Sequence, residues 1–141
     1  MAATISCHVV SAEEEIYSGE VQMVSATGSL GELGILPGHT PLLSPLIPGP
    51  VILRNAEGEE EIVYVSGGML EVQAKEVIIL ADTAIRAHDV DEAAALEAQK
   101  QAEHALANQS SEMDYSTAMI MFAEAAAQLR TLQALKKKLG G

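Results

Sequence analysis

Residues 28–43 read GSLGELGILPGHTPLL, and this stretch holds four glycines and two prolines interleaved with apolar residues. Glycine permits positive φ and close backbone approach, whereas proline fixes φ near about −65°. The regular spacing of these residues argues against a linker and favours a shaped loop. We expect Leu33, Ile35 and Leu36 to hold this loop against a sheet.

The turn-forming residues stop abruptly along the chain. All five prolines lie between Pro37 and Pro50, and no proline or glycine occurs between positions 69 and 139. β-branched runs precede this break, whereas thirteen alanines, with Glu, Gln, Lys and Leu among them, follow Glu92. The sequence therefore predicts an α+β protein: an N-terminal antiparallel β-sandwich in residues 1–86 and a C-terminal antiparallel α-helical hairpin in residues 89–141.

Short strands with one buried face account for the first part. Ile5, Cys7 and Val9 alternate with polar residues, which is the period of two expected of a strand, and Cys7 is expected to be a small buried side chain rather than half of a disulfide. Two hairpins are predicted, one pairing 51–54 with 61–65 and the other pairing 71–72 with 76–81. Many short strands separated by turns indicate a sandwich or a small barrel.

Helix signals begin where the turn residues end. Asp89 and Glu92 have the spacing of a capping box, which predicts a helix over about 90–107. Residues 108–111 have the composition of a turn, and Asp114 can cap a second helix. The facing sides of these helices hold mostly alanine and few leucines, so little apolar area joins them and a competing partner could open them.

Charge is distributed unevenly over a chain whose net charge is −12. This balance argues against binding to nucleic acid, because phosphate contacts need clustered Lys and Arg. Residues 130–141 nevertheless contain four basic residues and no acidic one. Two explanations stay open for this basic tail: cations are favoured at a helix C-terminus, or the tail binds an acidic partner surface. No apolar run is long enough to span a membrane and no leader pattern opens the chain, so we expect a cytosolic or peripheral protein.

Sequence patterns typical of enzymes are missing. The four histidines show no metal-ligand spacing with one another or with Cys7, and the chain contains no G-x-S-x-G, Walker phosphate loop or H-E-x-x-H. The acidic runs 13–15 and 59–61 are interpreted as solvated strand ends or turns. A non-catalytic protein without a cofactor or metal is therefore the favoured class.

Three motifs in a fixed order carry a family resemblance. They are the stretch 28–43, YVSGGMLEV at 64–72 and LADTA at 80–84. Together they resemble the epsilon subunit of the bacterial and chloroplast rotary ATP synthase, and the resemblance extends from about residue 4 to residue 138. It implies a flattened ten-stranded sandwich, in agreement with the strand pattern.

The resemblance also implies a function without chemistry of its own. Such a subunit belongs to the central stalk, or rotor, of a proton-translocating ATP synthase on the cytoplasmic face of the bacterial inner membrane, where it couples proton flow to ATP synthesis. Its sandwich binds the gamma subunit and rests on the membrane ring, which makes Glu32 and His39 the candidate ring contacts. Its helices inhibit ATP hydrolysis when they extend toward the catalytic alpha and beta subunits. In the extended position the basic end of the last helix meets these catalytic subunits, and the residues of this chain that match that role are Arg130, Lys136, Lys137 and Lys138.

Two departures from the family pattern limit this comparison. Some members bind ATP through an arginine early in the first helix, but Ala94 stands at that position, and Asp91 is explained by helix capping. Leu30 stands where many relatives carry an acid.

The alternative function, from another class, is a stand-alone ligand-binding β-sandwich with a helical appendage. A roomy pocket would favour the ligand-binding protein, whereas a flat apolar patch would favour the coupling subunit.

Overall fold

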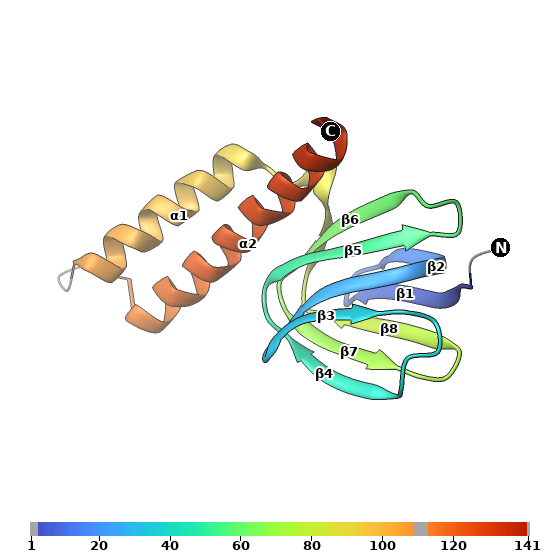
Figure 1. Cartoon of the computed structure of the whole chain (residues 1–141). Helices are drawn as coiled ribbons and strands as arrows, with labels where there is room; N and C mark the ends of the chain where they lie inside the picture. The colour runs from blue at the N-terminus through green and yellow to red at the C-terminus, as the bar shows by residue number, and fades with distance from the viewer. Residues whose placement is uncertain (1–2, 109–112, 141) are drawn as a thin grey trace.

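The computed structural model describes residues 3–108 and 113–140, and it consists of a β-sandwich followed by two helices (Figure 1). The strands are β1 Ile5–Ser11, β2 Glu15–Gly28, β3 Gly31–Ile35, β4 Leu42–Leu46, β5 Gly49–Asn55, β6 Glu60–Val65, β7 Gly68–Val72, β8 Glu76–Ala81 and β9 Ala84–Arg86. A short 3-10 helix, η1 Ala87–Asp89, leads into α1 Glu92–Ala107 and α2 Tyr115–Gly140. The predicted α+β order of strands and then helices is confirmed.

β2 joins the two layers of the sandwich. Its first half pairs with β1, and its second half pairs with β3 and β5. One layer contains β1, β8, β7 and β4, and the other contains β3, β2, β5, β6 and β9. The described part of the chain thus has nine strands, not the ten that the resemblance implies.

The pairing of β1 with β8 is parallel, whereas the other pairings recorded between described strands are antiparallel. The predicted antiparallel β-sandwich is confirmed, and β1 with β8 is its one parallel pairing among the described strands. Parallel strands need a long connection, and the six strands between β1 and β8 provide one.

Alternating side chains of both layers form the main core. Ile5, Cys7 and Val9 of β1 are buried, as their spacing predicts, and they pack with side chains such as Leu70 and Ile79 from the same layer. Burial raises the pKa of the Cys7 thiol to about 12, because a thiolate would lose its hydration there. Cys7 is therefore a small apolar residue of the core.

The stretch 28–43 is not one shaped loop. Residues 31–35 form β3, which pairs with β2, and only residues 36–41 connect it to β4 as a loop. Gly28 lies so close to the Gly31 carbonyl oxygen that an added Cβ would stand 2.9 Å from it, and Gly38 has a φ of 88°. These glycines serve the two ends of β3. Ile35 is buried and Leu33 packs against the core, but Leu36 is exposed, so its predicted anchoring role is wrong.

Both predicted hairpins are confirmed. β5 pairs antiparallel with β6 through a turn at residues 56–59, and β7 pairs antiparallel with β8 through a turn at residues 73–75. The Asn55 side chain accepts hydrogen bonds from the backbone N–H groups of Glu57 and Glu59, which fixes the first turn. The hairpin signals were local in sequence, and tertiary packing did not override them.

Helix α1 begins two residues later than the sequence predicts. Asp91 is its N-cap, and one carboxylate oxygen of Asp91 accepts a hydrogen bond from the Ala94 N–H at 3.0 Å. Asp89 instead ends η1, where the Val90 N–H donates to the Ala87 carbonyl. The expected capping box of Asp89 and Glu92 is therefore wrong, because the 3-10 turn takes up the chain before Asp91.

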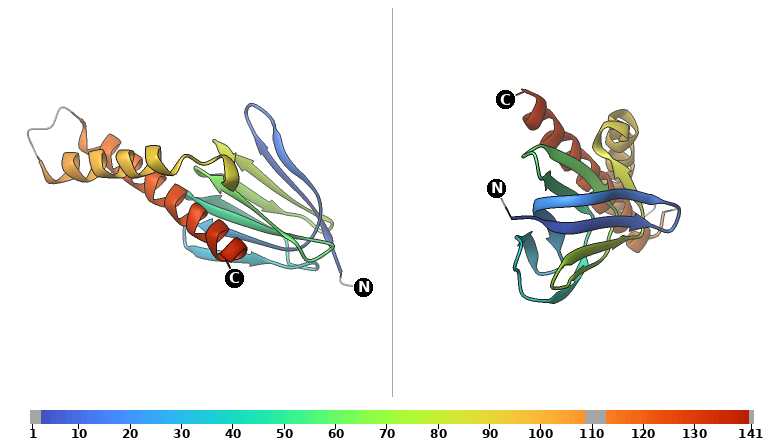
Figure 2. Two further views of the ribbon diagram at one scale, coloured as in Figure 1. Left: turned by 90° about the horizontal axis from the view of Figure 1, so that it is seen from above. Right: turned by 90° about the vertical axis from the view of Figure 1, so that its right-hand side faces the viewer.

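The two helices form the expected antiparallel hairpin, which leans out from one end of the sandwich (Figures 1 and 2). Buried alanines on both helices form their contact, among them Ala95 and Ala102 of α1 and Ala118 and Ala125 of α2. The predicted turn at 108–111 lies largely outside the described residues. The Asp114 carbonyl accepts from the Ala118 N–H at the start of α2. Neither helix, over the described residues, is long and apolar enough to cross a membrane.

Candidate functional site

Glu32 and His39 lie on either side of β3. Glu32 is exposed near the start of the strand, and its carboxylate accepts a hydrogen bond from the Thr27 hydroxyl of β2 at 3.2 Å. His39 is half-buried in the loop after β3, where its ring donates to the Thr40 carbonyl at 2.7 Å and its backbone N–H donates to the Leu36 carbonyl. From Glu32 to the end of β3 the strand rises roughly 10 Å. The structure therefore does not bring these two residues onto one loop.

The turn before Glu32 exposes an apolar side chain. Leu30 stands fully in solvent at the tip of the β2–β3 turn. Ile47 is also exposed, in the β4–β5 loop. Its backbone N–H donates a hydrogen bond to the Thr27 carbonyl of β2, which holds this loop beside the turn. Glu32 thus belongs to an end of the sandwich where apolar tips accompany one carboxylate.

The basic tail is held against its own chain. Arg130 donates to the Pro48 carbonyl at 3.3 Å, and Lys136 forms an ion pair with Glu92 at 2.7 Å, at the first turn of α1. Lys138 donates to the Glu60 carbonyl at the start of β6. Lys137 lines an open groove between α2 and the outer side of β5 and β6. These contacts involve exposed groups, so each contributes little to stability and all can be exchanged for other partners.

Asp91 and Ala94 do not form an anion site. The Asp91 carboxylate is engaged as the cap of α1, and the exposed Ala94 has no charge to offer a phosphate. Among residues 3–108 and 113–140, no three His, Cys, Asp or Glu side chains gather in a way that could hold a metal ion.

Sequence reasoning missed an apolar surface on the layer that the helices leave uncovered. The register aligns Pro45, Met69, Leu80 and Val10 across β4, β7, β8 and β1, and a second row aligns Leu43, Glu71, Ile78 and His8. Leu43, Pro45 and Leu80 are exposed, and Val10, Met69 and Ile78 are half-buried. We call these six apolar residues the outer face.

A signal for the outer face was present in the sequence. Residues 77–81 are a continuous apolar run, and a strand that is apolar on both sides is expected to be covered on both. Val77 and Ile79 point into the core, whereas Ile78 and Leu80 point outward. At the rim of the outer face, His8 of β1 lies 3.1 Å from Glu15 and 4.0 Å from Glu76. Charged groups therefore border the outer face, and Glu71 stands within its second row.

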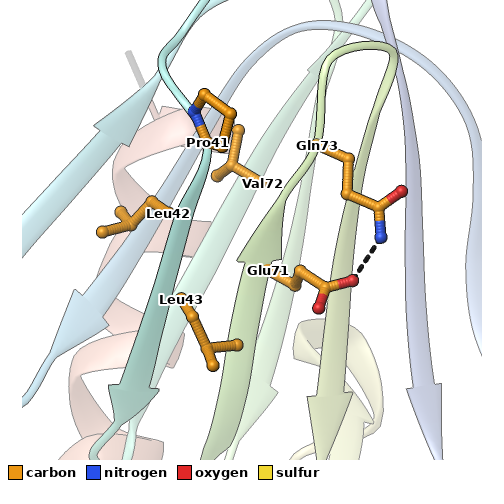
Figure 3. A pocket seen from close by; sticks show the side chains of 6 residues that line it. All are labelled: Pro41, Leu42, Leu43, Glu71, Val72 and Gln73. Carbon is orange, nitrogen blue, oxygen red and sulfur yellow. Dashed lines mark hydrogen bonds between the residues drawn. The ribbon is translucent and has the colours of Figure 1, made fainter.

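One end of the outer face is slightly hollowed (Figure 3). Leu43 and Glu71 stand on neighbouring strands there, and the Gln73 amide donates to the Glu71 carboxylate. The hollow is open to solvent and lined by few side chains. It is a surface depression rather than an enclosed ligand cavity.

Tyr64 anchors the hairpin to the other layer. Its neighbours Val63 and Val65 point into the main core, whereas Tyr64 points outward and is 1% exposed beneath α2. It packs with Val90, Ala127 and Leu132 in a second, smaller cluster, against which Ile85 also lies. Burial, and secondarily the negative charge of Glu124, raise the pKa of Tyr64 to about 12.

Comparison with known proteins agrees with this two-part organisation. The family model described as "ATP synthase, Delta/Epsilon chain, beta-sandwich domain" matches residues 4–87. The model described as "ATP synthase, Delta/Epsilon chain, long alpha-helix domain" matches residues 88–133. The chain therefore belongs to the delta/epsilon chain family of ATP synthase.

Individual relatives narrow this class to epsilon chains. The chain is 53% identical over 136 residues to the ATP synthase epsilon chain of Psychrobacter cryohalolentis, covering 96% of this chain and 99% of the relative. It is 54% identical to the epsilon chain of Psychrobacter sp. strain PRwf-1, with the same coverage.

Solved structures share the fold. A chain in the Euglena gracilis mitochondrial ATP synthase (OSCP/F1/c-ring) superimposes with a TM-score of 0.73 at 22% identity, covering 97% of this chain and 82% of that one. A chain in the Tetrahymena thermophila mitochondrial ATP synthase (central stalk/c-ring) gives a TM-score of 0.61 at 15% identity, covering 92% of this chain and 97% of that one.

Proposed function

We propose that this chain is a non-catalytic central-stalk subunit of a proton-translocating ATP synthase, which couples proton flow to ATP synthesis and restrains ATP hydrolysis through its C-terminal helices. The observation that carries the proposal is the outer face, an uncovered apolar surface on a chain that belongs to the epsilon family. Its place is the cytoplasmic face of the bacterial inner membrane, bound to the membrane through partners.

The outer face is the surface best suited to bind the gamma subunit. Its two rows lie on strands whose opposite sides are fixed by the main core, so it is a rigid platform. An apolar centre with charged residues at its rim is the common composition of a stable protein interface. The helices occupy the opposite layer and leave this platform free (Figure 1).

The end of the sandwich near Glu32 would rest on the membrane ring. Glu32 is held by the Thr27 hydroxyl and is exposed, so it can meet a polar or basic group of the ring. His39 lies beyond the other end of β3, in the loop of residues 36–41, and is the second ring contact of the proposal. Coupling then depends on binding of the sandwich to both the gamma subunit and the membrane ring.

The basic tail would bind the alpha and beta subunits in a second position of the hairpin. In this structure the hairpin lies against the sandwich, and we call this its docked position. Here the partners of Arg130, Lys136 and Lys138 are two backbone carbonyls and one exposed carboxylate of the same chain. An acidic surface on a catalytic subunit can replace them, because several charges acting together bias an equilibrium of a few kcal/mol. Lys137 would join them there.

The alternative, a ligand-binding sandwich, has less support. A small-molecule site is normally concave and encloses most of its ligand. The depressions at the outer face and beside Lys137 are open ones.

A binding experiment with the membrane-detached ATPase sector tests the proposal. The sector is stripped of its own epsilon chain, and the purified chain is added back as wild type, Leu80→Asp or Ile47→Asp. Leu80 lies on the outer face, whereas Ile47 is a similarly exposed apolar residue at the end of the sandwich, which makes it a matched control. A buried charge at the centre of an interface costs at least about 2 kcal/mol, so Leu80→Asp should weaken binding roughly thirtyfold or more.

Two results decide the outcome. Wild type and Ile47→Asp should bind and lower the rate of ATP hydrolysis, whereas Leu80→Asp should do neither at the same concentration. If wild type fails to bind the stripped sector, the proposed function is wrong. If Leu80→Asp binds like wild type, the outer face is not the gamma-binding surface.

A further inference from the structure

A single carboxylate interrupts the second row of the outer face. Glu71 of β7 is half-buried there, between Leu43 of β4 and Ile78 of β8. One of its carboxylate oxygens accepts a hydrogen bond from the Gln73 amide (Figure 3). No Lys or Arg among residues 3–108 and 113–140 forms an ion pair with Glu71. A negative charge is thus fixed on a mainly apolar surface without a counter-ion from its own chain.

The hollow at this end of the outer face lies beside Glu71 and has two unlike sides (Figure 3). Pro41 and Leu43 make one side apolar, whereas Glu71 and Gln73 make the other side polar. Its volume is about 370 Å³ and it is open to solvent, so a side chain of a bound protein can enter it. A long cationic side chain matches both sides, because Lys and Arg bury their methylene groups on apolar surface and keep the charged head at polar groups.

The strands of this layer carry outward-facing carboxylates but no basic side chain. β1, β4, β7, β8 and the first half of β2 contain no Lys or Arg. Beyond the second row, the register aligns Glu76 of β8 with Ser6 of β1 and Glu20 of β2, so both carboxylates face outward. Lys75, the nearest basic residue along the sequence, lies in the β7–β8 turn. The outer face therefore complements a partner surface that combines apolar and positively charged side chains.

We propose that an arginine of the gamma subunit enters this hollow and forms an ion pair with Glu71. The inference rests on the proposed binding of the gamma subunit to the outer face, and it identifies the chemistry by which that face recognises its partner. The Gln73 amide donates to one oxygen of the Glu71 carboxylate and leaves the other oxygen available. Arginine suits this acceptor better than lysine, because its planar guanidinium donates to carboxylates with fixed geometry.

The ion pair makes binding at the outer face selective. A partner that covered the outer face with apolar side chains alone would remove water from Glu71 and leave its charge uncompensated. That penalty opposes the binding of unrelated apolar surfaces, whereas a correctly placed arginine removes it. The apolar rows then supply the contact area, and Glu71 determines which partner surface can use it.

Binding to the ATPase sector stripped of its own epsilon chain tests the role of Glu71. Glu71→Gln removes the charge but keeps the shape of the side chain and an oxygen that can accept from Gln73. Glu71→Leu removes the polar group and continues the apolar row. Glu57→Gln is the matched control, because it removes one negative charge from the exposed β5–β6 turn, outside the outer face. Circular dichroism checks that each variant unfolds near the wild-type temperature, as surface substitutions usually do.

Glu71→Gln and Glu71→Leu should each weaken binding at least about thirtyfold, because each leaves the partner's arginine covered without its carboxylate. The loss should appear in the dissociation rate, while the association rate changes little, as expected for a charge pair that the interface covers. Glu57→Gln should bind like wild type. The leucine variant is the decisive one, since an apolar residue would strengthen binding if the partner were wholly apolar here.

Each contrary result identifies what failed. If Glu71→Gln or Glu71→Leu binds as tightly as wild type, or more tightly, no cation lies opposite Glu71 and the inference is wrong. A loss of the same size in Glu57→Gln would also overturn it, because the effect would then come from net charge. Failure of the proposed function itself looks different: wild type would not bind the stripped sector, or Leu80→Asp would bind as wild type does.

Discussion

Removing the hairpin is the perturbation that most directly separates the two parts of the chain. We expect residues 1–88 to fold alone, because the main core consists only of residues from β1 to β9 and their connections. What the truncation loses is the cover over Tyr64, together with the contacts that Ile62 and Ile85 make beneath α2.

The magnitude follows from the side chains that return to water. Re-exposing a large apolar side chain completely costs about 1.5–3 kcal/mol, and the truncation uncovers Tyr64 and Ile62 in part, because both remain on the surface of the sheet. We therefore expect a loss of roughly 2–4 kcal/mol from a total of about 5–15 kcal/mol. For a domain of this size that corresponds to a fall in Tm of roughly 10–30 °C.

Thermal unfolding followed by circular dichroism measures this loss, and Tyr64→Ser provides the control. In the truncated chain Tyr64 is a surface residue, so Tyr64→Ser should change stability by less than about 0.5 kcal/mol. In the full chain the same change removes a buried ring and should cost about 2–4 kcal/mol. A truncated chain without a cooperative transition, or equal costs in both chains, would refute the two-part reading.

Three further predictions concern coupling, inhibition and alkaline stability. Glu32→Ala combined with His39→Ala should lower the number of protons pumped per ATP in membranes without unfolding the chain; normal pumping in an assembled complex would remove both residues from the ring contact. Replacing Arg130, Lys136, Lys137 and Lys138 with Gln should raise the rate of ATP hydrolysis by the assembled complex. Inhibition by the wild-type chain should weaken as salt is added, because the Debye length is about 8 Å near physiological ionic strength and shorter above it. A chain with the neutralised tail that still inhibits fully at low salt would contradict this. Folding raises the pKa of Cys7 from 9.0 to about 12 and that of Tyr64 from 10.0 to about 12, so the folded state retains protons that the unfolded state loses. The free energy of unfolding should therefore hold below about pH 9 and fall as the pH rises toward 12. In urea unfolding at pH 8, 10 and 11, Cys7→Ala should flatten the first part of this fall, and an unchanged slope would exclude Cys7 as its cause.

Local patterns predicted much of the fold. The alternation around Cys7, the two hairpins and both helices depend on neighbours in sequence, and the structure confirms them. The stretch 28–43 misled because Gly31 and Gly34 lie within β3 and the other glycines and prolines flank it, and turn residues this dense hide a five-residue strand. The sequence predicts the start of α1 two residues early because both Asp89 and Asp91 suit an N-cap, and the 3-10 turn that takes Asp89 has no distinct local signal.

Features that depend on distant contacts could not be read in this way. The parallel pairing of β1 with β8 joins residues about 70 positions apart, and no local signal specifies it. The burial of Tyr64 depends on α2, which reaches it from the far end of the chain. The own-chain partners of Arg130, Lys136 and Lys138 likewise come from the sandwich and from the start of α1. The outer face is different, since the apolar run 77–81 could have indicated it.

Isolation of the native complex tests the central claim most directly. The chain carrying an affinity tag is expressed in the cell that makes it, and membranes are solubilised gently before capture on the tag. The account predicts that the gamma subunit, the alpha and beta subunits and the membrane ring are captured together with the chain, in an assembly that pumps protons when supplied with ATP. Two observations together would contradict the account: the tagged chain is captured without a gamma subunit, and the intact ATP synthase of the same membranes does not contain the tagged chain.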